Sequence, residues 1–326
     1  MGKRIRAIRR QLLTPDVKEC SLDRRGFFRK SREAQENVET VGAMFLTGYA
    51  HAVEAGSAAE ARQWLEAVPV AWRGFAYEGA GMGAAMLDGL PFGGDGHVAA
   101  LLEETGAEHV YMIYVGVGWA MARLPRFRWP SAGLFDPLLR GLVLDGYGFH
   151  QAYFHTRRYV HQQYQDLPFP WPDNETRHHS HHIVDQGIGR ALWFVGGTDV
   201  DQVTTLVERF PHLRRADLYA GVGLAATYAG GVGEAELISL RERAGRYRPQ
   251  LVQGSAFAAE ARVRAGNVLP HTAVATRVLC GTTPVHAARI TQDVRPAHPV
   301  DGAAPAYEYW RHDIAGQFVA LGGVRS

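Results

Sequence analysis

The chain has 326 residues, enough to bury a sizeable core, and its composition of 46% hydrophobic and 21% charged residues is that of an ordinary globular protein. The 35 Lys and Arg residues nearly balance the 33 Asp and Glu residues, and a net charge of +2 argues against a nucleic-acid partner. Its two cysteines, Cys20 and Cys280, supply neither a disulfide framework nor a thiolate metal cluster.

The chain opens with a basic segment, residues 1–30, that begins "MGKRIRAIRR". We interpret this segment as an amphipathic start that faces solvent; the alternative is contact with a membrane surface or an acidic partner. No apolar core follows it, and no run reaches the roughly 18 apolar residues of a membrane span. The sequence therefore predicts a cytoplasmic protein without an integral membrane span.

Seven short stretches rich in small residues recur at intervals of 30 to 41 residues. They begin at Gly48, Gly79, Gly116, Gly146, Gly187, Gly221 and Gly254. Two residues after this glycine every stretch has Gly or Ala, and four residues after it six of the seven do. Intervals of this size are typical of two-helix repeat units.

The surroundings of these stretches indicate helices. "PHLRRADLYAGVGLAATYAGG" starts with Pro and stops at a Gly pair, and short amphipathic segments such as "DVDQVTTLVERF" lie between the long ones. Gly inside a helix costs about 0.5–1 kcal/mol relative to Ala, so its repeated use indicates helices that approach closely on two faces. A dinucleotide-binding loop would need a preceding strand, which these stretches lack.

We therefore predict an all-α protein. Residues 31–290 form a single domain of about seven helix hairpins, arranged as a curved solenoid or a closed α/α toroid. Residues 291–326 form a C-terminal extension packed on this domain.

One copy, "LVLDGYGFHQAYFH", differs from the others. It is flanked by two irregular loops, "PRFRWPSAGLF" and "LPFPWPDNETRHHSHH", and His150 occupies the position where the other copies have a small residue. We predict that Asp145 and His150 face an internal cavity as catalytic acid–base groups. The alternative is that His150 is a core histidine with satisfied hydrogen bonds.

Other residues of the long helices are expected to line the same cavity as substrate-binding groups, and a buried carboxylate among them should have a raised pKa. They are Glu78, Trp119, Tyr147, Phe149, Asp185, Arg190 and Gln253. The alternative is a set of interhelical ion pairs, for example from Asp185 or Asp217 to Arg190 or Arg215.

The stretch "RHHSHH" places His178 and His182 four residues apart, as in two-histidine metal sites. No Glu lies between them and no third ligand is evident, so we predict a solvated loop and no metal. Motifs for nucleotide phosphates, a serine nucleophile elbow or a zinc protease are absent from the sequence, and we predict no cofactor.

Taken in order, six motifs resemble the UnbL-type family of uncharacterised bacterial proteins over roughly residues 25–281. They are "FAYEGAGMG", "YVGVGWAMARL", "LVLDGYGFHQAYFH", "DQGIGRALWFVGG", "DLYAGVGLAATYAGG" and "LVQGSAFAAEARVRAGN". Members of this family are associated with enediyne polyketide clusters, so the resemblance implies a role in antibiotic biosynthesis and a hydrophobic, polyene-like ligand. It carries over no catalytic residue.

We therefore expect an accessory enzyme of natural-product biosynthesis that performs cofactor-independent cyclisation or isomerisation of a hydrophobic small molecule. A terpenoid-like hydrocarbon is a second candidate substrate, because an acidic, aromatic cavity also suits carbocations. The alternative function is a non-catalytic helical-repeat scaffold, which binds a biosynthetic partner enzyme or a reactive product.

Overall fold

In a computed structural model the described residues (3–91, 94, 96–105, 108–172 and 174–322) form helices and connecting loops without any strand, which confirms the predicted all-α class. The α-helices are α1 (Lys3–Leu13), α2 (Leu22–Arg25), α3 (Arg32–Glu54), α4 (Ala58–Glu66), α5 (Val70–Gly89), α6 (His97–Thr105), α7 (Val110–Met121), α8 (Gly141–Phe154), α9 (Ser180–Val195), α10 (Val200–Glu208), α11 (His212–Tyr228), α12 (Glu234–Arg243), α13 (Arg248–Arg264), α14 (Pro270–Cys280), α15 (Pro284–Asp293) and α16 (Ala306–Ala320). The shorter turns are η1 (Val17–Cys20), η2 (Arg126–Arg128), η3 (Ala132–Leu134), η4 (Arg157–His161), η5 (Glu175–His179) and η6 (Gly245–Tyr247). None of the described helices is both long and apolar enough to cross a membrane.

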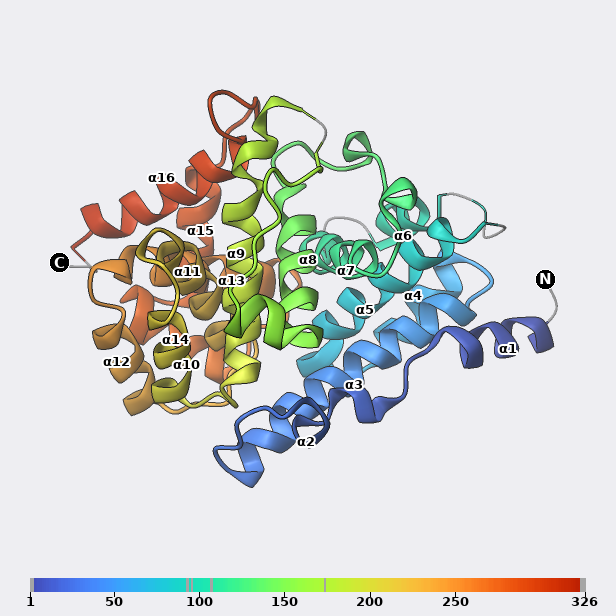
Figure 1. Ribbon diagram of the computed structural model, residues 1–326, viewed down its shortest axis with the longest axis horizontal. Coiled ribbons are helices and arrows are strands. Elements are labelled where there is room, and N and C mark those ends of the chain that lie inside the picture. Colours follow the sequence, from blue (N-terminus) through green and yellow to red (C-terminus); the bar gives the residue numbers. More distant parts are fainter. Residues whose placement is uncertain (1–2, 92–93, 95, 106–107, 173, 323–326) are drawn as a thin grey trace.

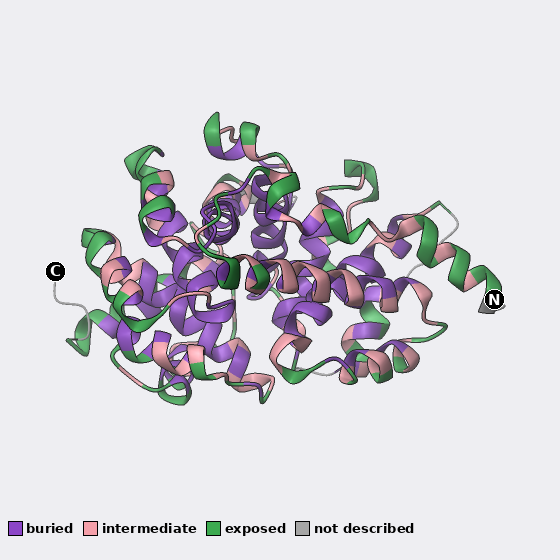
Figure 2. Cartoon of the chain, turned by 90° about the horizontal axis from the view of Figure 1, so that it is seen from below, coloured by how far each residue is buried: buried purple, intermediate pink, exposed green. Residues whose placement is uncertain are grey.

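Seven helices carry the glycine stretches: α3, α5, α7, α8, α9, α11 and α13. Most of them are buried on nearly all sides; in α7 every residue from Tyr111 to Met121 is buried. A helix that is apolar all round must lie inside a protein. Figure 2 shows these buried residues concentrated in the central helices, with exposed residues in the peripheral segments.

The shorter helices α4, α6, α10 and α12 lie at the positions of the predicted amphipathic segments. Side-chain caps fix where two of them begin: Ser57 Oγ accepts a hydrogen bond from Glu60 N at 3.2 Å, and Asp199 Oδ1 accepts one from Gln202 N at 2.9 Å. Each buries only a stripe of its surface against the long helices. They form an outer layer around the long helices.

Consecutive long helices approach backbone to backbone at the glycines. In five of the six steps, the first glycine of a stretch lies against the carbonyl of the residue that precedes the first glycine of the previous stretch; Gly79 instead lies against the carbonyl of Phe45. Five contacts follow this rule: Gly116 with Glu78, Gly146 with Val115, Gly187 with Asp145, Gly221 with Gln186, and Gly254 with Ala220. A Cβ atom at any of these glycines would overlap the facing carbonyl oxygen. The axial register between neighbouring helices is therefore the same over five steps.

Side-chain contacts also join the last of the long helices to early ones, whose places in the chain are labelled in Figure 1. Arg262 Nη1 of α13 donates to the Ala71 carbonyl of α5 at 3.2 Å, and Tyr111 Oη of α7 donates to Glu260 Oε1 of α13 at 3.3 Å. These contacts place α13 against both α5 and α7.

The C-terminal helix α16 packs on this array through its buried face. Arg311 Nη2 donates to Asp217 Oδ1 of α11 at 2.9 Å, and Trp310 Nε1 donates to the Thr291 carbonyl at 2.8 Å. The expected boundary at residue 291 falls inside α15, and α16 is the segment beyond it.

The glycine contacts predict a sharp difference between two Gly→Ala substitutions. Gly223→Ala in α11 would press a Cβ atom into the Leu251 carbonyl and should cost about 1–3 kcal/mol of unfolding free energy or more. Gly316→Ala in α16, where nothing lies within 4 Å, is the matched control and should stabilise by up to about 1 kcal/mol. Urea denaturation measures both, and equal effects would contradict the close packing.

Candidate functional site

A cavity of about 500 Å³, here called the chamber, lies between the first long helices and α8 and α9. Five of the expected site residues line it: Glu78, Trp119, Phe149, His150 and Arg190. Most of the remaining wall is apolar and includes Phe45, Phe75, Met82, Tyr153 and Phe194. A chamber of this size and lining suits a hydrophobic small molecule with a few polar contacts.

One polar part of the chamber wall is a buried ion bridge. Arg190 of α9 pairs with Asp145 of α8 through Nη1 and with Glu78 of α5 through Nη2, the latter at 3.4 Å. Gln186 Nε2 donates to the second oxygen of Asp145 at 2.7 Å, and Trp119 Nε1 donates to Glu78 Oε1 at 3.0 Å. All five side chains are buried, so the bridge holds three ionisable groups away from water.

The bridge contains more acidic than basic groups, because two carboxyl groups, Glu78 and Asp145, share one guanidinium group. Burial raises the pKa of Glu78; Arg190 opposes this shift, and the Asp145 carboxylate adds to it. Although burial acts against its charge, Arg190 has a pKa above its ordinary value because of the two carboxylates. Glu78 Oε1 accepts both of its hydrogen bonds, and no described residue donates to Oε2, which is therefore the oxygen that can carry a proton.

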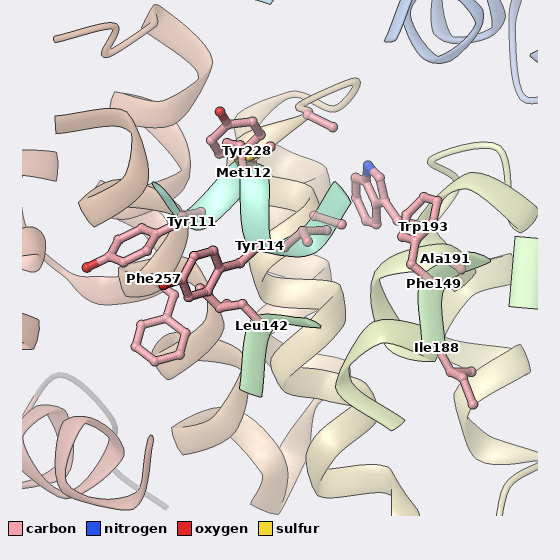
Figure 3. Packing of buried hydrophobic residues seen from close by; sticks show 14 of the residues in the cluster. Tyr111, Met112, Tyr114, Leu142, Phe149, Ile188, Ala191, Trp193, Tyr228 and Phe257 are labelled. Carbon is pink, nitrogen blue, oxygen red and sulfur yellow. The ribbon is translucent and has the colours of Figure 1, made fainter. Parts of the chain in front are cut away.

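Asp145 lies on the other side of the bridge from the chamber. It lines a second cavity of about 50 Å³, together with side chains of α7, α8, α11 and α13 such as Tyr111, Leu142 and Phe257. Figure 3 shows these three side chains in the packed interior. Arg190 lines both cavities. Asp145 accepts hydrogen bonds from both Gln186 and Arg190, and it therefore holds the Arg190 side chain in place.

His150 lies on the chamber wall, at the edge of Trp119, with ring centroids 5.6 Å apart. Only 5% of the residue is exposed, and its Nδ1 is buried without a hydrogen-bond partner among the described residues. Burial, followed by the positive charges of Arg123, His155 and Arg25, lowers the pKa of His150 to about 3. His150 is thus a neutral imidazole at pH 7, with a free hydrogen-bonding nitrogen.

Three expected lining residues lie elsewhere. The Tyr147 hydroxyl accepts from Gln151 Nε2 at 2.8 Å on the opposite side of α8, where its ring packs on Phe169. Asp185 lies against the loop that follows α8. Gln253 Oε1 has only a long contact, 3.5 Å, with Arg311 Nε. None of the three lines the chamber.

Asp185 and Asp217 do form interhelical ion pairs, but not with Arg190 or Arg215, the partners that we considered. Asp185 receives two hydrogen bonds from Arg214, at 2.6 and 2.8 Å, while burial raises its pKa to about 6. Asp217 pairs with Arg311 of α16 and with His182 Nδ1, the latter at 2.8 Å. Neither carboxylate contacts Arg190 or Arg215. His182 therefore serves an ion-pair network within the fold.

Of the other histidines of "RHHSHH", His178 and His179 lie on η5 and His181 on the first turn of α9, where its Nδ1 contacts the His178 carbonyl at 2.7 Å. Within the described part of the chain, no group of three or more His, Cys, Asp and Glu side chains has the spacing to hold a metal ion.

Sequence reasoning missed the part of the chamber wall that comes from the N-terminal segment and α3. Cys20, Val38, Val41 and Phe45 line it, as does Arg123 at the end of α7. Apolar residues at helical spacing in α3, such as Val38, Val41 and Phe45, were a signal of a buried face, but nothing in the sequence tells which cavity that face meets.

These features define the class of the protein: an all-helical array that encloses an apolar chamber with one buried ion bridge in its wall. The chain belongs to the family described as "Protein of unknown function (DUF1702)", whose model matches residues 4–318. No curated protein and no solved structure gives a significant match to the chain.

The ion bridge predicts the behaviour of Arg190→Met. Removing the guanidinium leaves Glu78 and Asp145 buried without a cation, which should cost about 3–5 kcal/mol at pH 7. The deficit relative to the parent should shrink as pH falls, because burial raises the pKa of Glu78. Without Arg190 to oppose that shift, the folded variant takes up a proton at Glu78 that the unfolded chain binds less readily.

Chemical denaturation of parent and variant between pH 5 and 8 measures this difference. The control is Arg32→Met, whose side chain is 93% exposed in an i,i+4 pair and should change stability by less than about 1 kcal/mol. A stable Arg190→Met protein with the parent's pH dependence would show that the bridge does not matter energetically.

Proposed function

We propose that the protein is an accessory enzyme of natural-product biosynthesis that cyclises or isomerises a hydrophobic, polyene-like intermediate in the chamber by cofactor-independent acid–base chemistry. The resemblance of its six motifs to the UnbL-type family supports the biosynthetic context and an enediyne-type polyketide as the class of intermediate. A cytoplasmic location and biosynthetic partner enzymes belong to the same proposal. We interpret the curved helix array as a closed toroid around the chamber.

The observation that carries the proposal is Glu78. It is a carboxyl group on the wall of an apolar chamber, its pKa is raised, and its Oε2 receives no hydrogen bond from the described residues. A carboxyl group tuned towards neutral pH is the kind of group that transfers protons in enzymes. Its neighbours Trp119 and Arg190 hydrogen-bond to Oε1, so they stabilise the carboxylate that forms when the proton leaves.

In the proposed reaction, the proton on Glu78 Oε2 adds to one end of a conjugated double bond of the ligand. A proton then leaves a neighbouring carbon and returns to the Glu78 carboxylate. The ligand is isomerised, or cyclised if a second double bond attacks the cationic carbon before the proton leaves, and no atom is gained or lost. The neutral His150 donates or accepts a hydrogen bond to orient the ligand.

This assignment changes the roles expected for the two catalytic residues. Asp145 becomes a positioning residue that acts through Arg190, and Glu78 replaces it as the proton-transferring group. The stacked rings of Trp119 and Phe149, whose centroids are 5.0 Å apart, offer a π-face to positive charge on the ligand. They therefore also suit a terpenoid-like substrate.

The rival function is a non-catalytic protein that binds and shields a reactive product. The chamber supports binding in either case, and the two functions differ only in whether Glu78 must transfer a proton.

Glu78→Gln tests the proposed function. Gln keeps the size of the side chain and an oxygen for Trp119 and Arg190 but cannot donate and recover a proton, so we expect activity to fall by about 10²–10⁴-fold with the fold intact. The measurement is complementation of a gene deletion with quantification of the accumulated intermediate. Activity of the parent should decline as pH rises through the raised pKa of Glu78, because the protonated form is lost.

The matched control is Glu260→Gln. Glu260 is also a buried glutamate with a raised pKa and an arginine partner, Arg264 at 2.9 Å, but it lies on α13 outside the chamber wall. It should complement fully. A fully active Glu78→Gln protein would exclude acid–base catalysis by this residue and favour the binding protein.

His150→Ala separates a chamber residue from a core residue. His150 Nδ1 makes no hydrogen bond, and the other glycine stretches have a small residue at this position, so Ala should leave stability within about 1 kcal/mol of the parent by thermal denaturation. Complementation should nevertheless be reduced at least tenfold, a loss that a misoriented substrate readily gives. A stable and fully active His150→Ala protein would remove His150 from the site.

A further inference from the structure

An open basin of about 640 Å³, here called the vestibule, adjoins the chamber. The two spaces share three consecutive wall residues, Tyr153, Phe154 and His155, at the end of α8. Glu78 and Arg190 do not line the vestibule. The chamber is therefore bounded by the vestibule on one side and by the ion bridge on another.

The vestibule is strongly basic. Its lining includes Arg24, Arg25, Arg157 and Arg158, and no carboxylate is part of it. Glu19, which lines the chamber, pairs with both Arg24 and Arg25, and Glu39 lies near Tyr153. Arg157 and Arg158 pair with no carboxylate among the described residues, so they leave an excess of positive charge beside the apolar chamber, in a protein whose total net charge is only +2.

Neutralising the end of α8 does not account for this charge. The C-terminus of a helix carries a partial charge of about −0.5, which a single cation outweighs. Arg157 and Arg158 are both exposed and lie on η4, a π-helical turn directly after α8. Such turns are rare and occur frequently at functional sites.

Inside the chamber, the wall near the vestibule contains a buried polar atom with no partner. His150 Nδ1 is unpartnered among the described residues, and the ring packs 4.6 Å from that of Phe154, which lines both spaces. The guanidinium group of Arg25 lies over the same Phe154 ring, with its Cζ 4.9 Å from the ring centroid. A ligand that spans this wall contacts aromatic rings on the chamber side and guanidinium groups on the vestibule side.

We propose that the chamber binds a long-chain anionic amphiphile, with its hydrocarbon tail in the chamber and its carboxylate or phosphate head group among the vestibule arginines. This inference rests on the proposed function in one respect, that the ligand is the substrate of the proposed reaction. The class of ligand follows from the chamber and the vestibule alone. A carboxylate or phosphate is the anion that guanidinium forks bind best, and desolvated aromatic walls bind the tail.

Isothermal titration with three C16 probes of equal chain length tests the proposal: hexadecanoate, hexadecyl phosphate and hexadecanol, each below its micellar concentration. We expect both anions, or the one whose head group fits, to bind at least about tenfold more tightly than the alcohol at low salt, with the advantage shrinking as salt is added. The tighter anion identifies the head group as carboxylate or phosphate.

The double variant Arg157→Gln/Arg158→Gln should lose about tenfold in affinity for the anions and keep its affinity for the alcohol, because the chamber is unchanged. The matched control is Arg32→Gln/Arg289→Gln, two side chains that are 93% and 76% exposed and lie outside both spaces. It should bind all three probes like the parent. Equal affinity of alcohol and anions, an unchanged double variant, or no binding of any probe would overturn the proposal.

Glu78→Gln keeps this test separate from the test of the proposed function. If it retains full activity while the anion preference holds, the acid–base reaction is wrong and the ligand class stands. If it abolishes activity while the anions bind no better than the alcohol, the reaction stands and the ligand class is wrong.

Discussion

Close contact between helix backbones is the constraint on which the rest of the structure depends. Each glycine contact fixes one long helix against the next along its axis, and the same register recurs from α5 through α13. Residues that precede the first glycine of each stretch therefore lie at similar heights along the axes of neighbouring helices. This is why Gln186 reaches Asp145 on the neighbouring helix at 2.7 Å, and why Arg190, one turn further along α9, reaches both Asp145 and Glu78.

The imbalance of charge in the bridge follows from this register. Two helices contribute a carboxylate at the level where only one contributes a guanidinium, and burial prevents water from compensating the difference. Asp145 takes the shorter ion pair and the amide of Gln186, whereas Glu78 is left with a longer contact and with the chamber beside it. The proton is therefore held most readily on Glu78, the carboxyl group that a ligand can reach.

Sequence patterns predicted the helices and the interior residues that belong to the glycine faces, because a glycine inside a helix has a cost that only close packing offsets. Glu78, Trp119, Phe149, His150 and Arg190 were found this way. Tyr147 was misplaced because it lies two positions from Phe149, which on a helix is nearly the opposite face. The partners of Asp185 and Asp217 could not be predicted, since they depend on how separate segments dock; Arg311 is 94 residues from Asp217 in the chain.

Two charged places border the apolar part of the chamber, and their positions bear on the chemistry. The ion bridge lies at the wall shared with the small inner cavity, whereas the vestibule arginines lie beyond the wall formed by Tyr153 to His155. A ligand whose anionic head stays in the vestibule can enter the chamber only tail first, because burying an unpaired anion costs far more than burying a hydrocarbon. Glu78 then meets a carbon remote from the head group. The bridge itself does not favour an anionic head beside Glu78, since its one cation, Arg190, is already shared by two carboxylates. The separation of the two charged places along one apolar chamber thus determines which part of such a ligand is presented to the acid.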